Sequence, residues 1–136
     1  MPSFSYLKKI FYKDIDQMGL VYYSRYFEFF EEARTELLNN MGIKVTTIED
    51  LGYFLPAISA TCDYKEGAKL EDIIIVKTVL QRMIGIKLKI VYEIYRKSDS
   101  HLLVSGHTMH VFTDKKGAPK RPPKFFIEKF KLISHD

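Results

Sequence analysis

Cysteine is scarce in this sequence, and tryptophan is absent. Cys62 is the single cysteine among 136 residues, so no disulfide can form within the chain, and no CxxC or Cys/His spacing indicates zinc. We expect Cys62 to be a small buried hydrophobic residue. No apolar run approaches the ~18 residues that span a bilayer, and no secretory leader pattern opens the chain. We therefore expect a cytoplasmic protein without a membrane span.

Familiar site motifs are missing as well. The sequence lacks GxGxxG, a P-loop, HExxH, GxSxG, paired CxxC and DxDxDG patterns, which leaves no recognisable nucleotide, zinc or calcium motif. His107 and His110 lie three positions apart in a predicted strand, so they point to opposite faces and favour structural roles. We expect no metal site and no tightly held cofactor.

Charge of one sign is only slightly in excess. The chain has 21 Lys and Arg against 17 Asp and Glu, a net charge of +4, and 46% hydrophobic residues. Length and composition indicate one globular domain over residues 1–136. The cations crowd the last quarter without a repeated pattern of exposed aromatics, so we expect a solvated basic surface and no nucleic-acid partner. A phosphate-bearing small molecule would use the same charges.

The first part of the chain predicts a strand followed by a long helix. Residues 4–12 suit a strand, and an acidic loop containing glycine follows at 14–19. From 23 to 41 apolar residues recur at steps of three and four, with Ser24 as a candidate N-cap and Gly42 just after the helix. Glu31 and Arg34 can pair on the polar side of this helix.

The rest of the chain is dominated by predicted strands. A candidate capping box at 46–49 opens a short second helix. Strands are then predicted at 57–64, 72–82, 86–96 and 102–113, and their short connections suit antiparallel neighbours. A last half-buried helical turn is predicted at 125–133. Because one long helix must cover the apolar face of five strands, we expect an α+β fold with a curved antiparallel sheet wrapped around that helix.

The loop that enters the long helix is the segment most suited to chemistry. Asp14 and Asp16 lie just before a helix start, where free N–H groups carry partial positive charge. An acidic side chain there could act as a base or nucleophile while an amide holds an oxyanion. The same acids could instead form an Asx turn and help to cap the helix.

The loop and helix together resemble a known family. The run YKDIDQMGLVY at 12–22, the aromatics Tyr26 and Phe27, and EEAR at 31–34 look like the signature of hot-dog-fold acyl-CoA thioesterases. The resemblance is to the 4-hydroxybenzoyl-CoA thioesterase and Tol-Pal-associated thioesterase group, and it covers nearly the whole chain. It implies a hot-dog fold and a homodimer, often paired into a tetramer, with active sites at the subunit interface.

The resemblance also implies roles for single residues. Asp16 matches the catalytic carboxylate, the backbone N–H of Tyr23 falls where the family places its carbonyl donor, and Gly19 permits the loop geometry. Many Tol-Pal-associated members carry His at the position of Tyr23 and Asn at that of Arg25, so the chain departs from them there. Charge and placement favour three contacts to the phosphates of coenzyme A (CoA), namely Arg82, Lys120 and Arg121.

The expected function is hydrolysis of a short-chain aliphatic or aromatic acyl-CoA to the free acid and CoA. CoA would then be part of the substrate, not a cofactor. Two alternatives use the same residues: hydrolysis of an acyl-carrier-protein thioester, and a non-catalytic module that binds acyl-CoA or serves as a scaffold, because the fold alone does not decide function.

Overall fold

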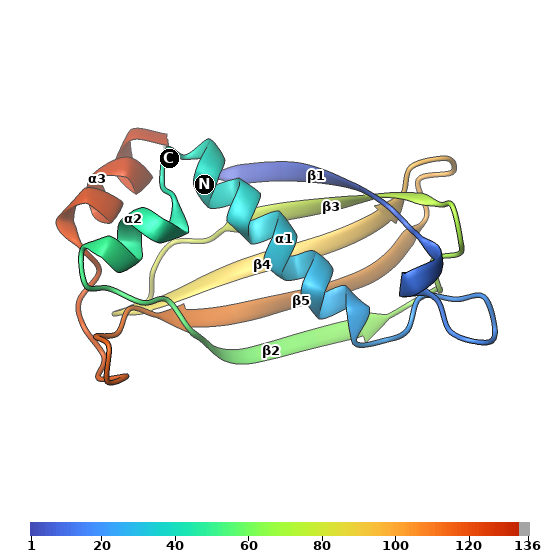
Figure 1. Cartoon of the computed structure of the whole chain (residues 1–136). Helices are drawn as coiled ribbons and strands as arrows, with labels where there is room; N and C mark the ends of the chain where they lie inside the picture. The colour runs from blue at the N-terminus through green and yellow to red at the C-terminus, as the bar shows by residue number, and fades with distance from the viewer. Residues whose placement is uncertain (134–136) are drawn as a thin grey trace.

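The computed structural model describes residues 1–133, which form a five-stranded antiparallel sheet and three α-helices (Figure 1). The sheet order is β1-β3-β4-β5-β2. The strands are β1 (Ser3–Lys9), β2 (Ala57–Tyr64), β3 (Ile73–Leu80), β4 (Lys87–Arg96) and β5 (Leu102–Val111). The helices are α1 (Arg25–Asn40), α2 (Val45–Asp50) and α3 (Lys124–Ile133), and a 3₁₀ turn, η1, spans Tyr12–Asp14.

Helix α1 lies across the concave face of the sheet, which confirms the predicted hot-dog architecture (Figure 1). Its apolar side carries Phe30, whose ring stacks on that of Tyr92 in β4 at a centroid distance of 4.2 Å. Gly106 in β5 permits this approach, because a Cβ there would meet the Thr61 carbonyl and the Phe30 ring. On the side of β1, the Tyr6 hydroxyl donates to Glu32 over 2.8 Å. The aromatic residues that recur at helical spacing in the sequence thus pack between α1 and the sheet.

Several predicted boundaries differ from the observed ones. The first strand ends at Lys9 because the chain turns into η1, and the strand after β2 ends at Leu80 instead of residue 82. The predicted capping box at 46–49 is wrong: α2 begins at Val45, its N-cap is Lys44, and no side chain caps it. In place of the single last helical turn that was predicted, the structure has a helix of ten residues, α3. Ser24 occupies the N-cap position of α1, but its side chain makes no capping hydrogen bond.

The sheet has two dissimilar ends. We call one the loop end: here β1 finishes, β3 begins and the loop before α1 lies, since Lys9 pairs with Ile73. We call the other the helix end, because α2 and α3 lie there, beside the last residues of β3 and β5 (Figure 1). The two ends of each strand therefore lie on different surfaces of the protomer, one at the loop end and the other at the helix end.

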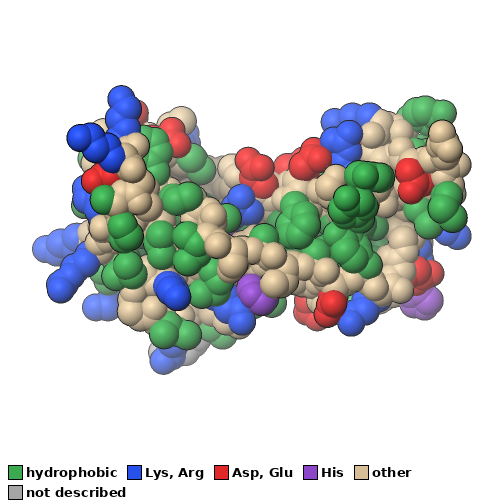
Figure 2. Space-filling view, turned by 90° about the horizontal axis from the view of Figure 1, so that it is seen from below, with side chains coloured by type: hydrophobic (Ala, Val, Ile, Leu, Met, Phe, Trp, Pro, Cys, Tyr) green, Lys and Arg blue, Asp and Glu red, His purple; other side chains and the backbone are tan. Residues whose placement is uncertain are grey.

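Strand β2 forms an open edge of the sheet. Its residues are exposed except for Cys62, which is half-buried and not the fully buried residue that was expected. Helix α1 packs over β1 and β3 at the opposite edge. Figure 2 looks onto the β2 edge and shows apolar side chains gathered toward both ends, with a hollow in the outline between them. An unpaired strand edge flanked by apolar surface is suited to pairing with another strand.

No helix in the described part of the chain is both long and apolar enough to cross a membrane.

Candidate active site

The loop before α1 is closed by hydrogen bonds of its own backbone. Asp14 is buried, and its carboxylate accepts the N–H of Phe11 over 3.0 Å while its carbonyl accepts the N–H of Tyr22 over 3.0 Å. Asp16 N–H donates to the Leu20 carbonyl at 2.8 Å. Gly19 has φ +78, a left-handed conformation that glycine adopts without strain. Asp14 thus stabilises the loop through these hydrogen bonds, and Asp16 lies at its exposed tip.

The carboxylate of Asp16 has one oxygen engaged and one available. Oδ1 accepts the N–H groups of Met18 and Leu20 over 2.8 and 3.3 Å, which is the Asx-turn geometry anticipated for this loop. Within residues 1–133, Oδ2 has no hydrogen-bond partner. Neither Asp14 nor Asp16 caps α1. The turn therefore orients the Asp16 carboxylate and leaves Oδ2 available for a reaction.

The start of α1 supplies a free backbone donor beside this carboxylate. Arg25 N–H bonds the Tyr22 carbonyl and Phe27 N–H the Ser24 carbonyl, whereas the N–H of Tyr23 meets no acceptor among the described residues. The Tyr64 hydroxyl donates to the Tyr23 carbonyl over 3.0 Å and so holds that peptide in place. Partial burial and neighbouring Cys62 raise the pKa of Tyr64 to about 12, so this donor keeps its proton. A free N–H at a helix start suits a developing negative charge.

Asp16 and Tyr23 line one cavity of about 330 Å³. Aromatic rings form much of its wall, with Tyr26 and Tyr64 5.6 Å apart and Tyr23 edge-on to Tyr64 at 6.5 Å. Residues 65–67 complete the wall on the side of β2. The cavity therefore holds an exposed carboxylate, a free amide and an apolar surface in one place.

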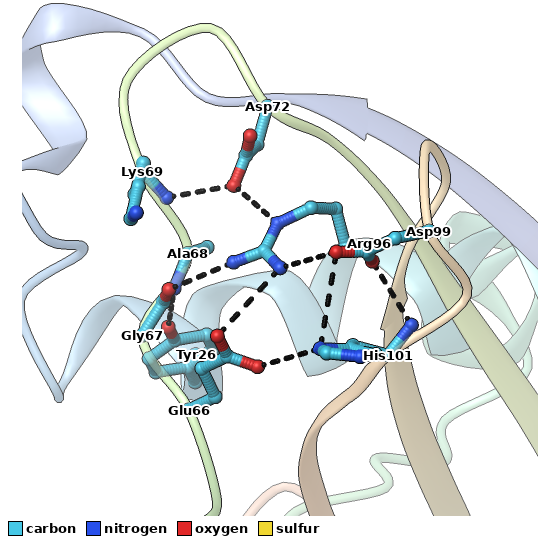
Figure 3. A network of polar contacts seen from close by, with 9 residues as sticks. All are labelled: Tyr26, Glu66, Gly67, Ala68, Lys69, Asp72, Arg96, Asp99 and His101. Atoms are coloured by element: carbon cyan, nitrogen blue, oxygen red, sulfur yellow. Dashed lines mark hydrogen bonds and ion pairs between the residues drawn. The ribbon is translucent and has the colours of Figure 1, made fainter.

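Arg96 holds the far wall of this cavity through a network of contacts (Figure 3). Its guanidinium donates to Asp72 over 3.0 Å, to Asp99 over 2.9 Å and to the Gly67 carbonyl over 3.2 Å. Asp72 also accepts the N–H of Lys69 at 2.9 Å, so one arginine joins the segment 66–72 to the β4–β5 turn. Arg96 is buried. Sequence reasoning missed it, although an arginine ending an alternating strand just before an acidic turn is a usable signal.

Replacing Arg96 with methionine is expected to lower the free energy of unfolding by about 2 kcal/mol, because the half-buried Asp72 carboxylate and Gly67 carbonyl lose their donor. Urea unfolding followed by circular dichroism measures this change. Lys97→Met is the matched control, since Lys97 is exposed and next in sequence. Equal effects of the two substitutions would show that Arg96 does not anchor this wall.

The three residues predicted to contact CoA lie at the helix end of the sheet. Arg82 follows β3, and Lys120 and Arg121 follow the turn after β5. The Lys120 ammonium lies 4.1 Å from the centre of the Tyr53 ring, while Arg121 and Arg82 are exposed. Within one chain the fold therefore does not bring these cations to Asp16.

A larger cavity, of about 520 Å³, also lies at the helix end, between α1, α2 and the ends of β4 and β5. It is lined by Arg34, and the predicted Glu31–Arg34 ion pair is not formed there. The Arg34 guanidinium instead lies close enough to buried Tyr92 to oppose the rise in the pKa of its hydroxyl that burial causes. His110 is buried in its wall, and His107 lies on the other face, 3.0 Å from Thr61, which confirms the predicted opposition of the two histidines.

His110 makes stability depend on acidic pH. Burial, and next the Arg34 guanidinium, lower its pKa from 6.5 to about 4. The unfolded chain binds a proton here below pH 6.5, but the folded chain does so only near pH 4, so folding is favoured above 6.5. This residue should reduce the free energy of unfolding by roughly 3 kcal/mol between those values.

The measurement is urea unfolding at pH 7 and pH 4.5. His110→Asn should lose about 2 kcal/mol less than wild type on acidification, since it has no group to titrate. His107→Asn is the matched variant on the other face of the sheet, where His107 is half-buried. A pH dependence unchanged by His110→Asn would contradict the assignment.

Among the described residues, no group of three or more His, Cys, Asp or Glu side chains is placed to hold a metal ion.

Comparison with known proteins identifies the family. The model of the Thioesterase-like superfamily matches residues 12–130, most of the chain. The protein belongs to this superfamily. It is a member of the acyl-CoA thioester hydrolases. The matched segment includes the Asp16 loop and four of the five strands, all but β1.

Individual relatives agree with this family. The chain is 30% identical over 134 residues to the acyl-CoA thioesterase YbgC of Haemophilus influenzae, which covers 98% of this chain and 95% of the relative. It is 26% identical over 127 residues to a 1,4-dihydroxy-2-naphthoyl-CoA hydrolase of Synechocystis, covering 90% of this chain and 92% of that one. These similarities extend over nearly the full length of each hydrolase.

Solved structures agree with the fold of this thioesterase. A 1,4-dihydroxy-2-naphthoyl-CoA thioesterase from Synechocystis superposes with a TM-score of 0.89 at 21% identity, over 98% of this chain and 99% of that one. A 4-hydroxybenzoyl-CoA thioesterase, an Asp-to-Asn variant in complex with 4-hydroxybenzoyl-CoA, superposes with a TM-score of 0.87 at 18% identity, over 95% and 99% of the two chains.

Proposed function

We propose that this thioesterase hydrolyses a short-chain aliphatic or aromatic acyl-CoA, with Asp16 as the catalytic carboxylate and the Tyr23 N–H as the oxyanion donor. The observation that carries the proposal is the free Oδ2 of Asp16 and the free N–H of Tyr23 on one cavity. A related thioesterase was crystallised with its substrate as an Asp-to-Asn variant, which supports a central carboxylate in this fold.

The chemistry needs few groups because a thioester carbonyl is electrophilic and a thiolate leaves readily. In one route Asp16 attacks the carbonyl carbon, the C–S bond breaks, CoA leaves as the thiolate, and water then hydrolyses the mixed anhydride. In the other route Asp16 takes a proton from a water that attacks the same carbon, and the C–S bond then breaks to release CoA as the thiolate. In both routes the carbonyl oxygen becomes negative, and one amide donor contributes about 3 kcal/mol of transition-state stabilisation.

We infer that the active form is a homodimer joined through the β2 edges. A two-fold axis through the middle of β2 pairs the strands antiparallel. The helix end of one protomer then lies beside the loop end of its partner, because the two ends of β2 exchange places. Arg82, Lys120 and Arg121 of one protomer thereby lie on the side of the partner's Asp16, where CoA phosphates would extend. Pairing of two such dimers into a tetramer is a further expectation.

The test is release of free thiol from a panel of acyl-CoA substrates, followed with a disulfide chromogen. Acetyl-, butyryl-, hexanoyl-, palmitoyl-, benzoyl- and 4-hydroxybenzoyl-CoA separate aliphatic from aromatic preference. A maximum on the shorter aliphatic or aromatic substrates is the expected result. Absence of turnover on the whole panel by folded protein would contradict the proposal, and saturable acyl-CoA binding without turnover would identify a binding module instead.

A further inference from the structure

We propose that the larger cavity is the acyl-tail pocket and that Arg34 makes it selective for acyl groups ending in a carboxylate. This inference rests on the proposed function, since the tail belongs to the substrate hydrolysed at Asp16. It goes further by naming the chemical class of that substrate and the residue that would recognise it.

The cavity has the size and lining of a small-molecule site. Its volume of about 520 Å³ lies within the range of roughly 300 to 1,000 Å³ that is typical of ligand pockets. Leu38, Ile48 and Ile90 give it apolar walls from α1, α2 and β4, and Arg34 enters it from α1. A lining that combines these apolar side chains with the Arg34 cation suits a chain that is apolar along its length and charged at its end.

The Arg34 guanidinium has donors to spare. It is half-buried and forms no ion pair within residues 1–133. Its charge acts on the neighbouring Tyr92 hydroxyl, where it opposes the rise in pKa that burial causes. A guanidinium has five N–H donors in a planar fork that matches a carboxylate. The remaining donors are therefore available to a ligand.

A directed chain of hydrogen bonds fixes how Arg34 meets Tyr92. The Leu55 carbonyl lies 3.3 Å from His110 Nδ1 and can only accept, so Nδ1 carries the proton of the neutral ring. His110 Nε2 then accepts from Thr108 at 2.8 Å, and Thr108 accepts from Tyr92 at 2.7 Å. The Tyr92 oxygen consequently keeps only acceptor capacity toward Arg34. The chain is uncharged and so offers Arg34 no competing negative charge.

Acidic residues near the cavity do not neutralise Arg34. Glu31 and Glu49 are exposed side chains at the mouth, where water screens them. The Asp114 carboxylate accepts the N–H groups of Lys116 and Ala118 through one oxygen, over 2.9 and 3.0 Å, so its own turn orients it, and it forms no ion pair with Arg34 within residues 1–133. In Figure 2 acidic side chains border the hollow between the two ends. The inner cavity therefore keeps the positive charge of Arg34.

The dimer brings this pocket to the reacting atoms. In one chain the pocket lies at the helix end and Asp16 at the loop end. Antiparallel pairing of two β2 edges sets the pocket of one protomer beside the Asp16 loop of its partner. The thioester then lies at the partner's carboxylate, and the acyl tail extends into the pocket toward Arg34.

The experiment compares two acyl-CoA substrates of equal shape, glutaryl-CoA and 5-methylhexanoyl-CoA, which differ by a terminal carboxylate against an isopropyl group. Wild type should have a kcat/KM about tenfold or more higher for glutaryl-CoA. Arg34→Met should remove this preference by lowering glutaryl-CoA turnover, with the neutral substrate changed by less than about threefold. Arg34→Lys should recover part of it, since charge remains without the fork.

Lys115→Met is the matched control, because Lys115 is an exposed cation at the mouth of the same cavity. It should leave the preference unchanged. Equal turnover of the two substrates by wild type, or equal losses on both in Arg34→Met, would overturn the inference while leaving the hydrolase intact. If no acyl-CoA is hydrolysed, the proposed function fails, and calorimetric binding of glutarate by wild type but not by Arg34→Met would still support the pocket. Equal glutarate binding by both proteins would reject it.

Discussion

Replacing Asp16 with asparagine is expected to lower kcat by about 100-fold or more, with KM changed by less than about threefold. The amide oxygen of asparagine can accept the same two N–H groups that Oδ1 accepts now, from Met18 and Leu20. The loop therefore keeps its turn, and only the negative charge and its nucleophilic or basic oxygen are lost. Steady-state kinetics with the best acyl-CoA of the panel measures the effect.

Two further variants separate chemistry from structure. Asp50→Asn removes a carboxylate from the exposed end of α2 and should leave kcat at the wild-type value. Asp16→Ala should be as inactive as Asp16→Asn and less stable, because the Asx turn is lost too. If Asp16→Asn retained more than about half of the wild-type kcat, Asp16 would be a structural turn residue and the proposed mechanism would be wrong.

Placing a lysine at position 60 of β2 is expected to separate the dimer and to lower kcat/KM by about 100-fold. Ala60 is exposed in the middle of the open edge, so Ala60→Lys should leave each protomer folded. At the two-fold axis, however, two ammonium groups would face each other at close range. The loss of activity follows because each site would need the loop end of one protomer and the helix end of the other.

Light scattering after size exclusion measures the mass of each variant in solution. The thiol assay measures the activity of the same sample. Ser5→Lys is the control, since Ser5 is exposed on β1, the other edge of the sheet. It should change neither quantity. Dimers that persist in Ala60→Lys, or monomers that keep full activity, would show that β2 does not join the protomers or that one chain contains a complete site.

The polar contacts around the site illustrate why part of it escaped sequence reasoning. The Asp16 loop was found because acids, a glycine and a helix start follow one another within a few residues. Arg96 contacts Asp72 and Gly67 across more than twenty residues of chain, and Arg34 acts on Tyr92 across more than fifty. Spacing within one helix suggested a Glu31–Arg34 pair, but it carries no information on the strand residues that Arg34 approaches.

The order and type of the strands and helices, and the family, could be predicted from the residues alone. Periods of two and of three to four residues reflect which side of a strand or helix meets the core, and that local signal predicted the five strands and the long helix. Boundaries were less certain, because the ends of β1, β3 and α2 depend on turns that only packing selects.

The tertiary structure alone decided which residues meet. Antiparallel order sends Asp16 to one end of the sheet and Arg82, Lys120 and Arg34 to the other, a division that no local pattern records. It also left β2 as an open edge, because the strand order places β2 last in the sheet, beside β5 alone. The physical reason is that residue types set local conformation, whereas the position of a side chain relative to distant ones depends on how the strands are ordered and closed over the helix.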